Sequence, residues 1–459
     1  MNDAVNALRS KLRGEVLLPG EAGYDRERAA FNTALDHRPA LIVAAAEAAD
    51  VREAVTFAGC CNLPVAVRGT GHGASVPADG GMLITTAGMK GVRIDPGNAA
   101  AHVAAGSTWA EVTAAAAPAG LAPLSGSAPF VGVTGYLLGG GLPLLGRTFG
   151  WAADRIRSLQ VVTADGELRR ADAREEPELF WALRGGRDNF GVVTGLEIEL
   201  LRLREIWGGG LYFDAGDPQE AARLLAAYLR WTKTVPEEMN SSLALVGFPD
   251  LPALPAPLRG RYAAHLRIAC VADPETAEQL VAPLRALGEP LLDGLGPVPV
   301  TETGRIHAEP SRAMPWQGEI AMLDDLGEEE ARLLVEVAGP AAPGRCVVEI
   351  RHLGGALARR PRHAAPAGHR AARYLLGGLV RLAAPDAEAA TRAGAGLFAA
   401  LAPRTLGRFA NFLGHGPQAA PELVATAYEP EDLRRLRKLK SMWDPENLFR
   451  LNHNIPPAA

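Results

Sequence analysis

Glycine is concentrated in two segments that each adjoin an apolar strand, and this arrangement constrains the fold more than any other feature of the chain. The first segment is VAVRGTGHGAS at residues 65–75, and the second is SGSAPFVGVTGYLLGGGLPLLG at residues 125–146. Glycine lowers the stability of regular structure, so it is retained where the chain turns sharply or lies against a ligand. Backbone N–H groups in such turns form a concave site for an anion such as pyrophosphate. Together with WALRGGRDNFGVVT at 181–194, these segments predict a site for a large group that carries phosphates.

Simple tight turns are the alternative for each segment taken singly, because short glycine motifs have low specificity. RGTGHG at 68–73 does not match the common dinucleotide fingerprint, since it lacks the GxGxxG spacing and the residues after it break a helix. The chain contains neither a GxxxxGK[ST] motif nor a GxSxG motif. These observations argue against a nucleotide triphosphatase and against a hydrolase of the GxSxG type.

The composition is that of an ordinary globular protein long enough for two domains. The chain has 459 residues, of which 48% are hydrophobic and 22% charged, and its formal net charge is −5. A negative balance argues against a nucleic-acid surface, which needs a basic face to neutralise phosphates. No apolar run reaches the ~18 residues of a membrane-spanning helix, and residues 1–16 lack the apolar stretch of a signal peptide. We therefore expect a cytoplasmic protein with no nucleic-acid partner and no membrane partner.

The four cysteines predict no metal site. Cys60 and Cys61 are adjacent, Cys270 and Cys346 are isolated, and no cysteine–histidine cluster has zinc spacing. We expect all four to be buried or half-buried thiols.

Apolar periodicity and turn residues predict the local elements of the first part of the chain. They are a strand–helix–strand unit at 38–70, a helix from Thr108 to Gly120, a strand hairpin with its turn at Asp165–Gly166, a short helix at 175–186 and a strand at 189–201.

The texture of the sequence changes near residue 205, where longer helices and strands with proline-rich breaks begin. We expect a second domain at about 206–405. RRPRHAAPAGHR at 359–370 is typical of a mobile, solvated basic loop. The apolar, asparagine-rich tail at the C-terminus should dock on the rest of the protein, because free tails are usually polar.

Glycine flanks His72 on both sides within the first glycine-rich segment. Its imidazole can therefore lie close to a ligand that the same loop holds. Imidazole is a nucleophile near neutral pH. We expect His72 either to attack an electrophilic methyl carbon of a tightly held cofactor or to act as an acid or base.

Four motifs, in the same order, resemble those of the berberine-bridge-enzyme-like branch of the vanillyl-alcohol-oxidase flavoproteins, in its bacterial form. They lie at 65–75, 131–156, 161–200 and 443–457, and VVEIRHLGGALAR at 347–359 resembles a strand and turn of the substrate domain. The resemblance implies an α+β fold with a two-lobed, PCMH-type FAD-binding domain. Its divisions are an FAD-binding domain at 1–205 (core about 35–205), an inserted substrate-binding domain of antiparallel sheet flanked by helices at 206–404, and a C-terminal segment at 405–459 that returns to the FAD-binding domain.

The resemblance also implies which residues hold FAD. In these relatives the histidine of the first motif carries the flavin through its 8α-methyl group, so His72 is the expected covalent link. The residues expected along the phosphates are Arg68, Gly69, Thr70, Gly71, Gly73 and Ala74. Those expected along the rest of the cofactor are Gly132, Val133, Thr134, Gly135, Gly139, Gly140 and Gly141, with Gly191 and Val193 toward the adenine and Asn452 and Asn454 near the isoalloxazine ring.

The chain departs from its relatives at several of these positions. Many relatives carry a second, cysteinyl link just before the second motif, where this chain has Ala128. A single covalent link through His72 and no cysteinyl link are therefore expected. Pro143 interrupts the usual GGGIGWL pattern, and Arg187 and Asp188 occupy positions that are usually glycine.

The resemblance implies an FAD-linked oxidase of secondary metabolism. A C–H beside a hydroxyl or an amine of a small-molecule substrate would give a hydride to flavin N5, and O2 would reoxidise the flavin to yield H2O2. Two alternatives stay open: a flavin dehydrogenase that uses another acceptor, and a non-redox cyclase or binding protein on the same fold.

Tyr428 is the first candidate for the catalytic base, because relatives often carry an active-site tyrosine before the last helix. Tyr374 is the second. A phenol needs cationic or hydrogen-bonding neighbours to lower its pKa of about 10. Arg351 and His352 are candidate neighbours, and only one of them should face the cleft because side chains alternate along a strand.

Overall fold

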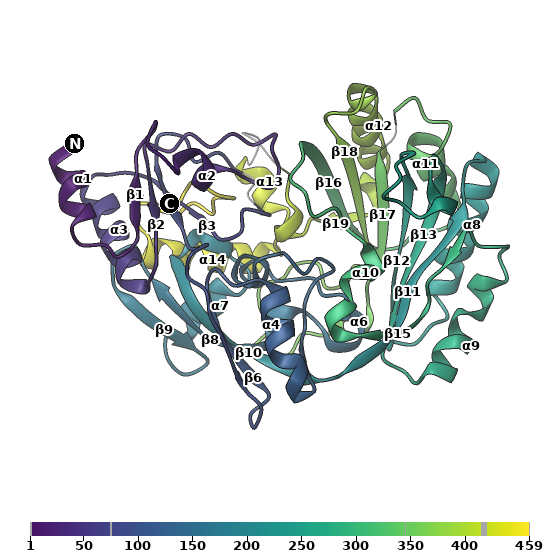
Figure 1. Ribbon diagram of the computed structural model, residues 1–459, viewed down its shortest axis with the longest axis horizontal. Coiled ribbons are helices and arrows are strands. Elements are labelled where there is room, and N and C mark those ends of the chain that lie inside the picture. The colour runs from purple at the N-terminus through teal and green to yellow at the C-terminus, as the bar shows by residue number, and fades with distance from the viewer. Residues whose placement is uncertain (1, 74–75, 345, 415–419, 459) are drawn as a thin grey trace.

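The computed structural model describes residues 2–73, 76–344, 346–414 and 420–458. Helices pack on three β-sheets in this part of the chain, which confirms the predicted α+β class. Figure 1 shows the first two sheets on the left and the third on the right.

The first sheet is a small unit in the order β1-β2-β4-β3, and it fixes the start of the loop that contains His72. Its strands are β1 (Glu15–Leu17), β2 (Leu41–Ala44), β3 (Val65–Arg68) and β4 (Met82–Thr85), and its helices are α1 (Asn2–Arg9), α2 (Tyr24–Arg28) and α3 (Ala48–Cys60). β4 pairs in parallel with both β2 and β3, because α3 carries the chain back across the sheet. The predicted strand–helix–strand unit is therefore confirmed. Loops at the carboxyl ends of parallel strands are the usual place for a ligand in such units.

The second sheet is antiparallel, with the order β5-β6-β10-β8-β9 and β7 paired with β10. Its strands are β5 (Val92–Asp95), β6 (Ala100–Ala104), β7 (Leu121–Pro123), β8 (Ile156–Val162), β9 (Leu168–Asp172) and β10 (Val192–Arg202). The short helices around it are α4 (Trp109–Ala116), α5 (Val133–Leu138), α6 (Gly146–Phe149) and α7 (Pro177–Leu183). The helix predicted to begin at Thr108 is confirmed. Thr108 and Glu111 form a reciprocal capping box, and Gly120 ends the segment in a left-handed conformation.

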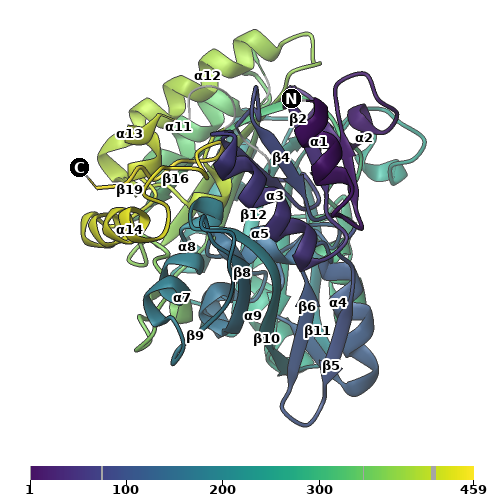
Figure 2. The same cartoon turned by 90° about the vertical axis from the view of Figure 1, so that its left-hand side faces the viewer.

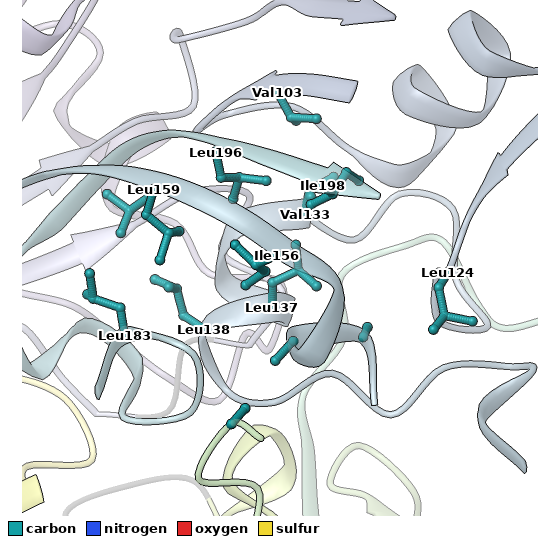
Figure 3. Packing of buried hydrophobic residues seen from close by; sticks show 14 of the residues in the cluster. Val103, Leu124, Val133, Leu137, Leu138, Ile156, Leu159, Leu183, Leu196 and Ile198 are labelled. Carbon is teal, nitrogen blue, oxygen red and sulfur yellow. The ribbon is translucent and has the colours of Figure 1, made fainter. Parts of the chain in front are cut away.

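The first and second sheets with their helices are called the first lobe. Helix α5 connects the second glycine-rich segment to the hydrophobic core of this lobe. Val133, Leu137 and Leu138 are buried and pack with Leu159 of β8 and Leu196 of β10, as Figure 3 shows. The apolar side of α5 therefore fixes the helix on the sheet, and the glycine turn that follows is held in a defined place.

The third sheet forms the inserted part of the chain, with the main order β14-β11-β13-β12-β17-β18-β16-β19 and β15 paired with β11. Its strands are β11 (Glu205–Asp214), β12 (Met239–Gly247), β13 (Tyr262–Cys270), β14 (Leu292–Asp293), β15 (Gly296–Pro299), β16 (Trp316–Leu323), β17 (Val347–His352), β18 (Tyr374–Arg381) and β19 (Thr405–Gly407). The helices α8 (Pro218–Thr232), α9 (Pro274–Arg285), α11 (Glu328–Ala338) and α12 (Ala387–Ala400) lie along its outer side (Figure 1), and α10 (Gly304–His307) lies near the first lobe. Alternate residues of the six long strands β11, β12, β13, β16, β17 and β18 enter the core under these helices, so the residues between them face the rest of the protein.

The C-terminal segment packs against the helices beside the second sheet. It contains α13 (Pro421–Ala425) and α14 (Pro430–Trp443), and Figure 2 shows α14 close to α7. The ammonium group of Lys440 is fully buried and donates to the carboxylate of Asp444 at 2.6 Å and to the carbonyl oxygens of Asn189 and Phe449 at 2.7 and 3.0 Å. The amide of Asn189 in turn accepts a hydrogen bond from the backbone of Ile455 at 2.8 Å.

Two expectations about this architecture are wrong in detail. Cys60 and Cys61 are exposed at the end of α3, whereas Cys270 and Cys346 are buried as expected. Residues 359–370 are not a solvated loop throughout, because 364–369 are buried and the guanidinium of Arg370 pairs with Asp154 at 3.0 Å. The expected domain end at 404 falls just before β19, which pairs with β16 of the third sheet.

Among the described residues no helix is both long and apolar enough to cross a membrane.

Candidate active site

One large cavity lies where the loop after β3, the segment around α5 and the third sheet meet. Its volume is about 220 Å³, and it opens to solvent. Sites for small molecules usually lie in concave spaces of this kind, so this cavity is the candidate ligand site. The predicted cofactor residues that line it are Arg68, Gly69, Thr70, Gly71, His72, Gly73, Gly132, Thr134, Gly135, Gly191, Val193 and Asn452.

The remaining predicted cofactor residues do not line this cavity. Val133 is completely buried in the core of the lobe, because it lies on the sheet side of α5. Asn454 follows Asn452 by two residues and is absent from the cavity wall. Gly139, Gly140 and Gly141 lie behind the wall, where their lack of a side chain leaves room for residues that do line it. Ala74 lies outside the described residues.

His72 presents its ring to the cavity between two aromatic side chains. Its ring centroid lies 4.6 Å from that of Phe31 and 5.5 Å from that of Phe130. Its Nδ1 is buried and has no hydrogen-bond partner among the described residues. Burial lowers the pKa of His72, and the nearby carboxylate of Glu309 opposes this effect. A neutral imidazole with one unpaired nitrogen at the wall fits a residue that binds a cofactor through that ring.

Two features of the His72 loop hold it in place. Gly71 adopts a left-handed conformation with a φ of 74°, which a side chain would disfavour. Arg68, just before it, is mostly buried, and its guanidinium donates to the carbonyl oxygen of Ala29 and lies 3.5 Å from the carboxylate of Glu27. Burial lowers the pKa of Arg68, and Glu27 opposes this effect.

The three consecutive glycines after α5 allow two polar side chains to approach the turn closely. A Cβ on Gly139 would lie 1.6 Å from Oδ1 of Asn411, and a Cβ on Gly141 would lie 2.6 Å from the ring of Tyr136. The Nδ2 of Asn411 donates to the carbonyl oxygen of Tyr136 at 2.8 Å. Both Asn411 and Tyr136 line the cavity, so the glycines shape its wall without reaching it.

Tyr136 brings a buried phenol to the cavity. Its hydroxyl has no hydrogen-bond partner in the described part of the chain. Burial raises its pKa, and the positive charge of Arg351 opposes this effect. The hydroxyl therefore stays protonated and can donate a hydrogen bond to a ligand.

Arg187 and Asp188 also lie at the cavity wall. The backbone of Arg187 is left-handed, with a φ of 56°, a conformation that glycine adopts more readily than arginine. Its guanidinium donates to the carbonyl oxygens of Ala410 and Gly73 at 2.8 and 3.3 Å and lies 3.1 Å from Nδ1 of His453. It therefore ties the His72 loop to the C-terminal segment. Burial raises the pKa of Asp188, and Arg187 opposes this effect.

The third sheet contributes a charged group to the far side of the cavity. Arg351 of β17 lines the cavity, and its Nε donates to the carboxylate of Glu349 at 3.0 Å. Burial would raise the pKa of Glu349, but Arg351 and Arg267 hold it well below its usual range. Arg351 also lies over the ring of Phe412, 5.4 Å from its centroid. The alternation predicted for this strand thus places Arg351 at the cavity.

Glu309 completes this side of the cavity. It comes from the loop after α10 and accepts a hydrogen bond from the hydroxyl of Ser127 in the second glycine-rich segment. It and Asp188 are the carboxylates that line the cavity within the described residues. Glu309 belongs to the inserted part of the chain, whereas Asp188 belongs to the first lobe.

Neither tyrosine predicted as the base lines this cavity. The hydroxyl of Tyr428 is buried and donates to the carbonyl oxygen of Gly185 at 3.0 Å, and burial raises its pKa. The hydroxyl of Tyr374 lies under the third sheet, 2.7 Å from Oγ1 of Thr232. Both hydroxyls serve internal packing in this geometry, so a base must be sought elsewhere.

The sequence-based search missed Tyr136, Asn411 and Glu309. Tyr136 carried a signal, since it lies inside a segment already assigned to the cofactor. Asn411 and Glu309 stand in stretches without a motif, and only the fold brings them to the cavity. No cluster of histidine, cysteine or acidic side chains suited to a metal ion occurs in the described ranges.

Comparisons with known proteins agree with this geometry. The family model described as FAD binding domain matches residues 39–172, and the model described as berberine and berberine like matches residues 409–456. The two matches cover the first lobe and the returning C-terminal segment, which together form much of the cavity.

Curated relatives match almost the entire chain. It is 30% identical to (R)-6-hydroxynicotine oxidase of Paenarthrobacter nicotinovorans over 98% of each chain. It is 23% identical to an FAD-linked oxidoreductase of Dictyostelium discoideum over 99% of this chain and 97% of the relative.

Solved structures share the whole fold. 6-Hydroxy-D-nicotine oxidase from Arthrobacter nicotinovorans has a TM-score of 0.85 at 28% identity. The superposition covers 97% of this chain and 98% of the oxidase chain. Glucooligosaccharide oxidase from Acremonium strictum, described with a 6-S-cysteinyl, 8α-N1-histidyl FAD, also has a TM-score of 0.85, at 20% identity over 99% of this chain and all of its own. At 20% identity, the glucooligosaccharide oxidase shows only that the fold is shared.

Proposed function

Because this chain belongs to the FAD-linked oxidoreductases of the berberine-bridge-enzyme-like branch of the vanillyl-alcohol-oxidase family, we propose that it oxidises a small molecule at a C–H beside a hydroxyl or an amine. The observation that carries this proposal is the buried, unpaired imidazole nitrogen of His72 at the wall of the large cavity.

His72 holds the FAD by a single covalent link. Burial keeps its imidazole neutral and therefore nucleophilic. Ala128 lines the cavity at the place where relatives carry the second, cysteinyl link, and its methyl group cannot form a bond to the cofactor. The loop from Arg68 to Gly73 and the backbone at Gly132 support the phosphates, and Asn452 and Gly191 line the rest of the site.

Bound FAD would supply the redox chemistry, namely acceptance of a hydride and transfer of the electrons to O2 to give H2O2. The protein binds and orients the substrate and removes its proton. FAD binding is assigned to 1–205 with the C-terminal segment, and substrate binding to 206–407.

Glu309 accepts the proton of the substrate hydroxyl or amine. Of the two carboxylates at the cavity, it is the one that comes from the substrate-binding part. Ser127 donates to one of its oxygens, which orients the carboxylate and leaves the other oxygen free of that bond. A positioned carboxylate of this kind contributes about 10²–10⁴-fold to proton transfer.

Three other side chains orient the substrate. The phenol of Tyr136 and the amide of Asn411 offer hydrogen bonds, and Asn411 is itself held by the carbonyl oxygen of Tyr136. Arg351 presents a positive charge whose position Glu349 fixes. Phe412 lies under this guanidinium and provides an apolar surface.

A substrate screen tests the proposal. The FAD-loaded protein is incubated with alcohols, sugars and amines, including 6-hydroxynicotine because a relative is named for its oxidation, while O2 consumption and H2O2 are recorded. We expect at least one compound to give equal amounts of substrate oxidised and H2O2 formed. Flavin reduction by a substrate under argon, with no O2 consumption in air, would instead identify a dehydrogenase. A flavin that stays oxidised with every compound would contradict the proposal.

A further inference from the structure

A second, smaller cavity lies behind Arg351, between the α6 segment and strands β12, β13 and β17. Its volume is about 40 Å³, enough for a group of a few atoms. The polar residues that concern us at its wall are Arg147, Ser242, Arg267, His307, Arg351 and His352. We call this cavity the inner chamber. Arg351 also lines the large cavity, so the two spaces share a wall.

The inner chamber is rich in hydrogen-bond donors. The guanidinium of Arg147 donates to Nε2 of His352 at 2.9 Å, which places the ring proton of His352 on Nδ1. This Nδ1–H is buried and finds no acceptor in the described ranges. The Nδ1 of His307 is also buried without a hydrogen bond. The side chains of both histidines are at least nine-tenths buried, so solvent does not supply the missing partners.

Acceptors are scarce in the inner chamber. The carboxylate of Glu349 already accepts from Ser242 at 3.0 Å, from Arg267 at 2.6 Å and from Arg351 at 3.0 Å. The other nearby carboxylate, Glu309, lies 3.7 Å from Nδ1 of His307 and accepts from Ser127. Buried donors without acceptors are unfavourable, so an acceptor from outside the chain is expected here.

The charge around the inner chamber is also unbalanced. Arg147 has no carboxylate within 4.0 Å in the part of the chain that the structure describes, and its N–H groups bond to carbonyl oxygens and to His352. Burial lowers the pKa of His352 to about 2, and burial also holds the pKa of His307 well below its usual value. Both histidines are therefore neutral at pH 7. Arg267 and Arg351 share the carboxylate of Glu349, whereas Glu237 acts on Arg147 only from beyond contact distance, so the positive charge of Arg147 is unpaired among the described residues in a buried space.

We propose that the inner chamber binds one small monovalent anion of carboxylate size. Free Nη groups of Arg267 and Arg351 and the Nδ1–H of His352 are the donors that it would meet. The anion is either free in solution or is a carboxylate of the substrate, in which case the inference rests on the proposed function and adds acidic substrates to it.

Titration of the oxidised holoenzyme with sodium formate, followed by calorimetry, tests the inner chamber without turnover. We expect one formate per chain for the wild type and at least tenfold weaker binding for Arg267→Gln and for His352→Phe. The second variant keeps a ring against Tyr374 and so protects the test if the first does not fold. Arg261→Gln, which removes an exposed guanidinium paired with Asp214, is the matched control and should bind like the wild type.

A wild type that binds no formate, or variants that bind it unchanged, would overturn the inner chamber as an anion site. With a substrate from the screen above, competition by formate assigns the site to a substrate carboxylate, and binding without competition assigns it to a free anion. Because the titration needs no turnover, a protein that binds formate but oxidises nothing refutes the proposed function and leaves the anion site in place.

Discussion

The backbone N–H of Gly132 donates a hydrogen bond to the hydroxyl of Thr70 at 3.3 Å, which joins the two glycine-rich segments into one cavity wall. The segments are far apart in sequence, and each is anchored by a different sheet. A Cβ on Gly132 would lie 3.1 Å from Cγ2 of Thr70, so the contact leaves little room for a side chain. The candidate cofactor site is thus built where the first and second sheets meet, and each sheet supplies one turn.

Gly139→Ala should disturb the active site through Asn411. The added methyl group would lie 1.6 Å from Oδ1 of Asn411, which must move and give up its bond to Tyr136. We expect a fall in kcat/KM of about tenfold or more with normal FAD content, which corresponds to about 1.4 kcal/mol. Gly59→Ala, on an open face of α3, is the control.

The same change in an Asn411→Ala background gives a sharper test of this contact. Asn411→Ala removes the atoms that the new methyl group would strike, so Gly139→Ala should then have little further effect. Additive effects of the two substitutions would show that Gly139 acts by another route.

Glu309→Gln should slow the chemical step and leave the cofactor in place. The amide cannot accept the substrate proton, so the rate of flavin reduction should fall by about 10²–10⁴-fold. Stopped-flow reduction under argon measures this rate directly. Glu302→Gln, an exposed change near the same helix, should leave the rate unaltered. Reduction at the wild-type rate in Glu309→Gln would exclude Glu309 as the proton acceptor.

Acid should weaken the fold at a pH above the range in which carboxylates titrate. Burial, with the charge of Arg147, lowers the pKa of His352 to about 2, and burial holds the pKa values of His265 and His307 well below their usual value. In the unfolded chain these histidines take up protons below about pH 6.5, whereas in the folded chain they stay neutral. The unfolded state then binds more protons, so stability falls as the pH falls.

Each of these histidines should lower the free energy of unfolding by about 1.4 kcal/mol per pH unit below about pH 6. Denaturant unfolding at pH 7.5, 6.0 and 5.0 measures the slope, and His352→Phe should make it shallower. Equal stability at pH 7.5 and 5.0 would mean that these rings are not buried in neutral form.

Lys440→Met should release the C-terminal tail. The substitution leaves the buried carboxylate of Asp444 without its cation and leaves the carbonyl oxygens of Asn189 and Phe449 without a donor. Breaking a buried pair in this way usually costs about 3–5 kcal/mol. Thermal unfolding should show a lower Tm, and limited proteolysis should cut the tail sooner. Lys438→Met, on the exposed side of α14, should change neither result.

The sequence predicted the elements whose signals are local. The strand–helix–strand unit at 38–70, the capped helix from Thr108 and the hairpin at Asp165–Gly166 each depend on apolar periodicity or on turn residues close in sequence. The part of the cavity wall that the glycine turns form was also predictable, because these turns carry their own signature. The role of Gly139, Gly140 and Gly141 was not, since it depends on Asn411 and Tyr136 packing against the turn.

The substrate side could not be predicted because no local pattern marks it. Glu309 reaches the cavity from a loop without a motif, and its partner Ser127 lies in another lobe. Tyr428 was chosen from its position along the chain, but its hydroxyl turns toward the carbonyl of Gly185. Segment 359–370 has the composition of an exposed loop, yet Arg370 finds Asp154 and the adjoining residues become buried. In each case a contact between distant segments decides the outcome.

The mass of the acid-denatured protein tests the central claim most directly. Wild-type protein and His72→Ala are purified with abundant FAD, unfolded in acid and analysed by mass spectrometry and by the colour of the precipitate. We expect a yellow wild-type chain heavier by one FAD, and a colourless His72→Ala chain with the mass of the polypeptide alone. A wild-type chain that is loaded with FAD when folded but loses all of it on unfolding would contradict the account.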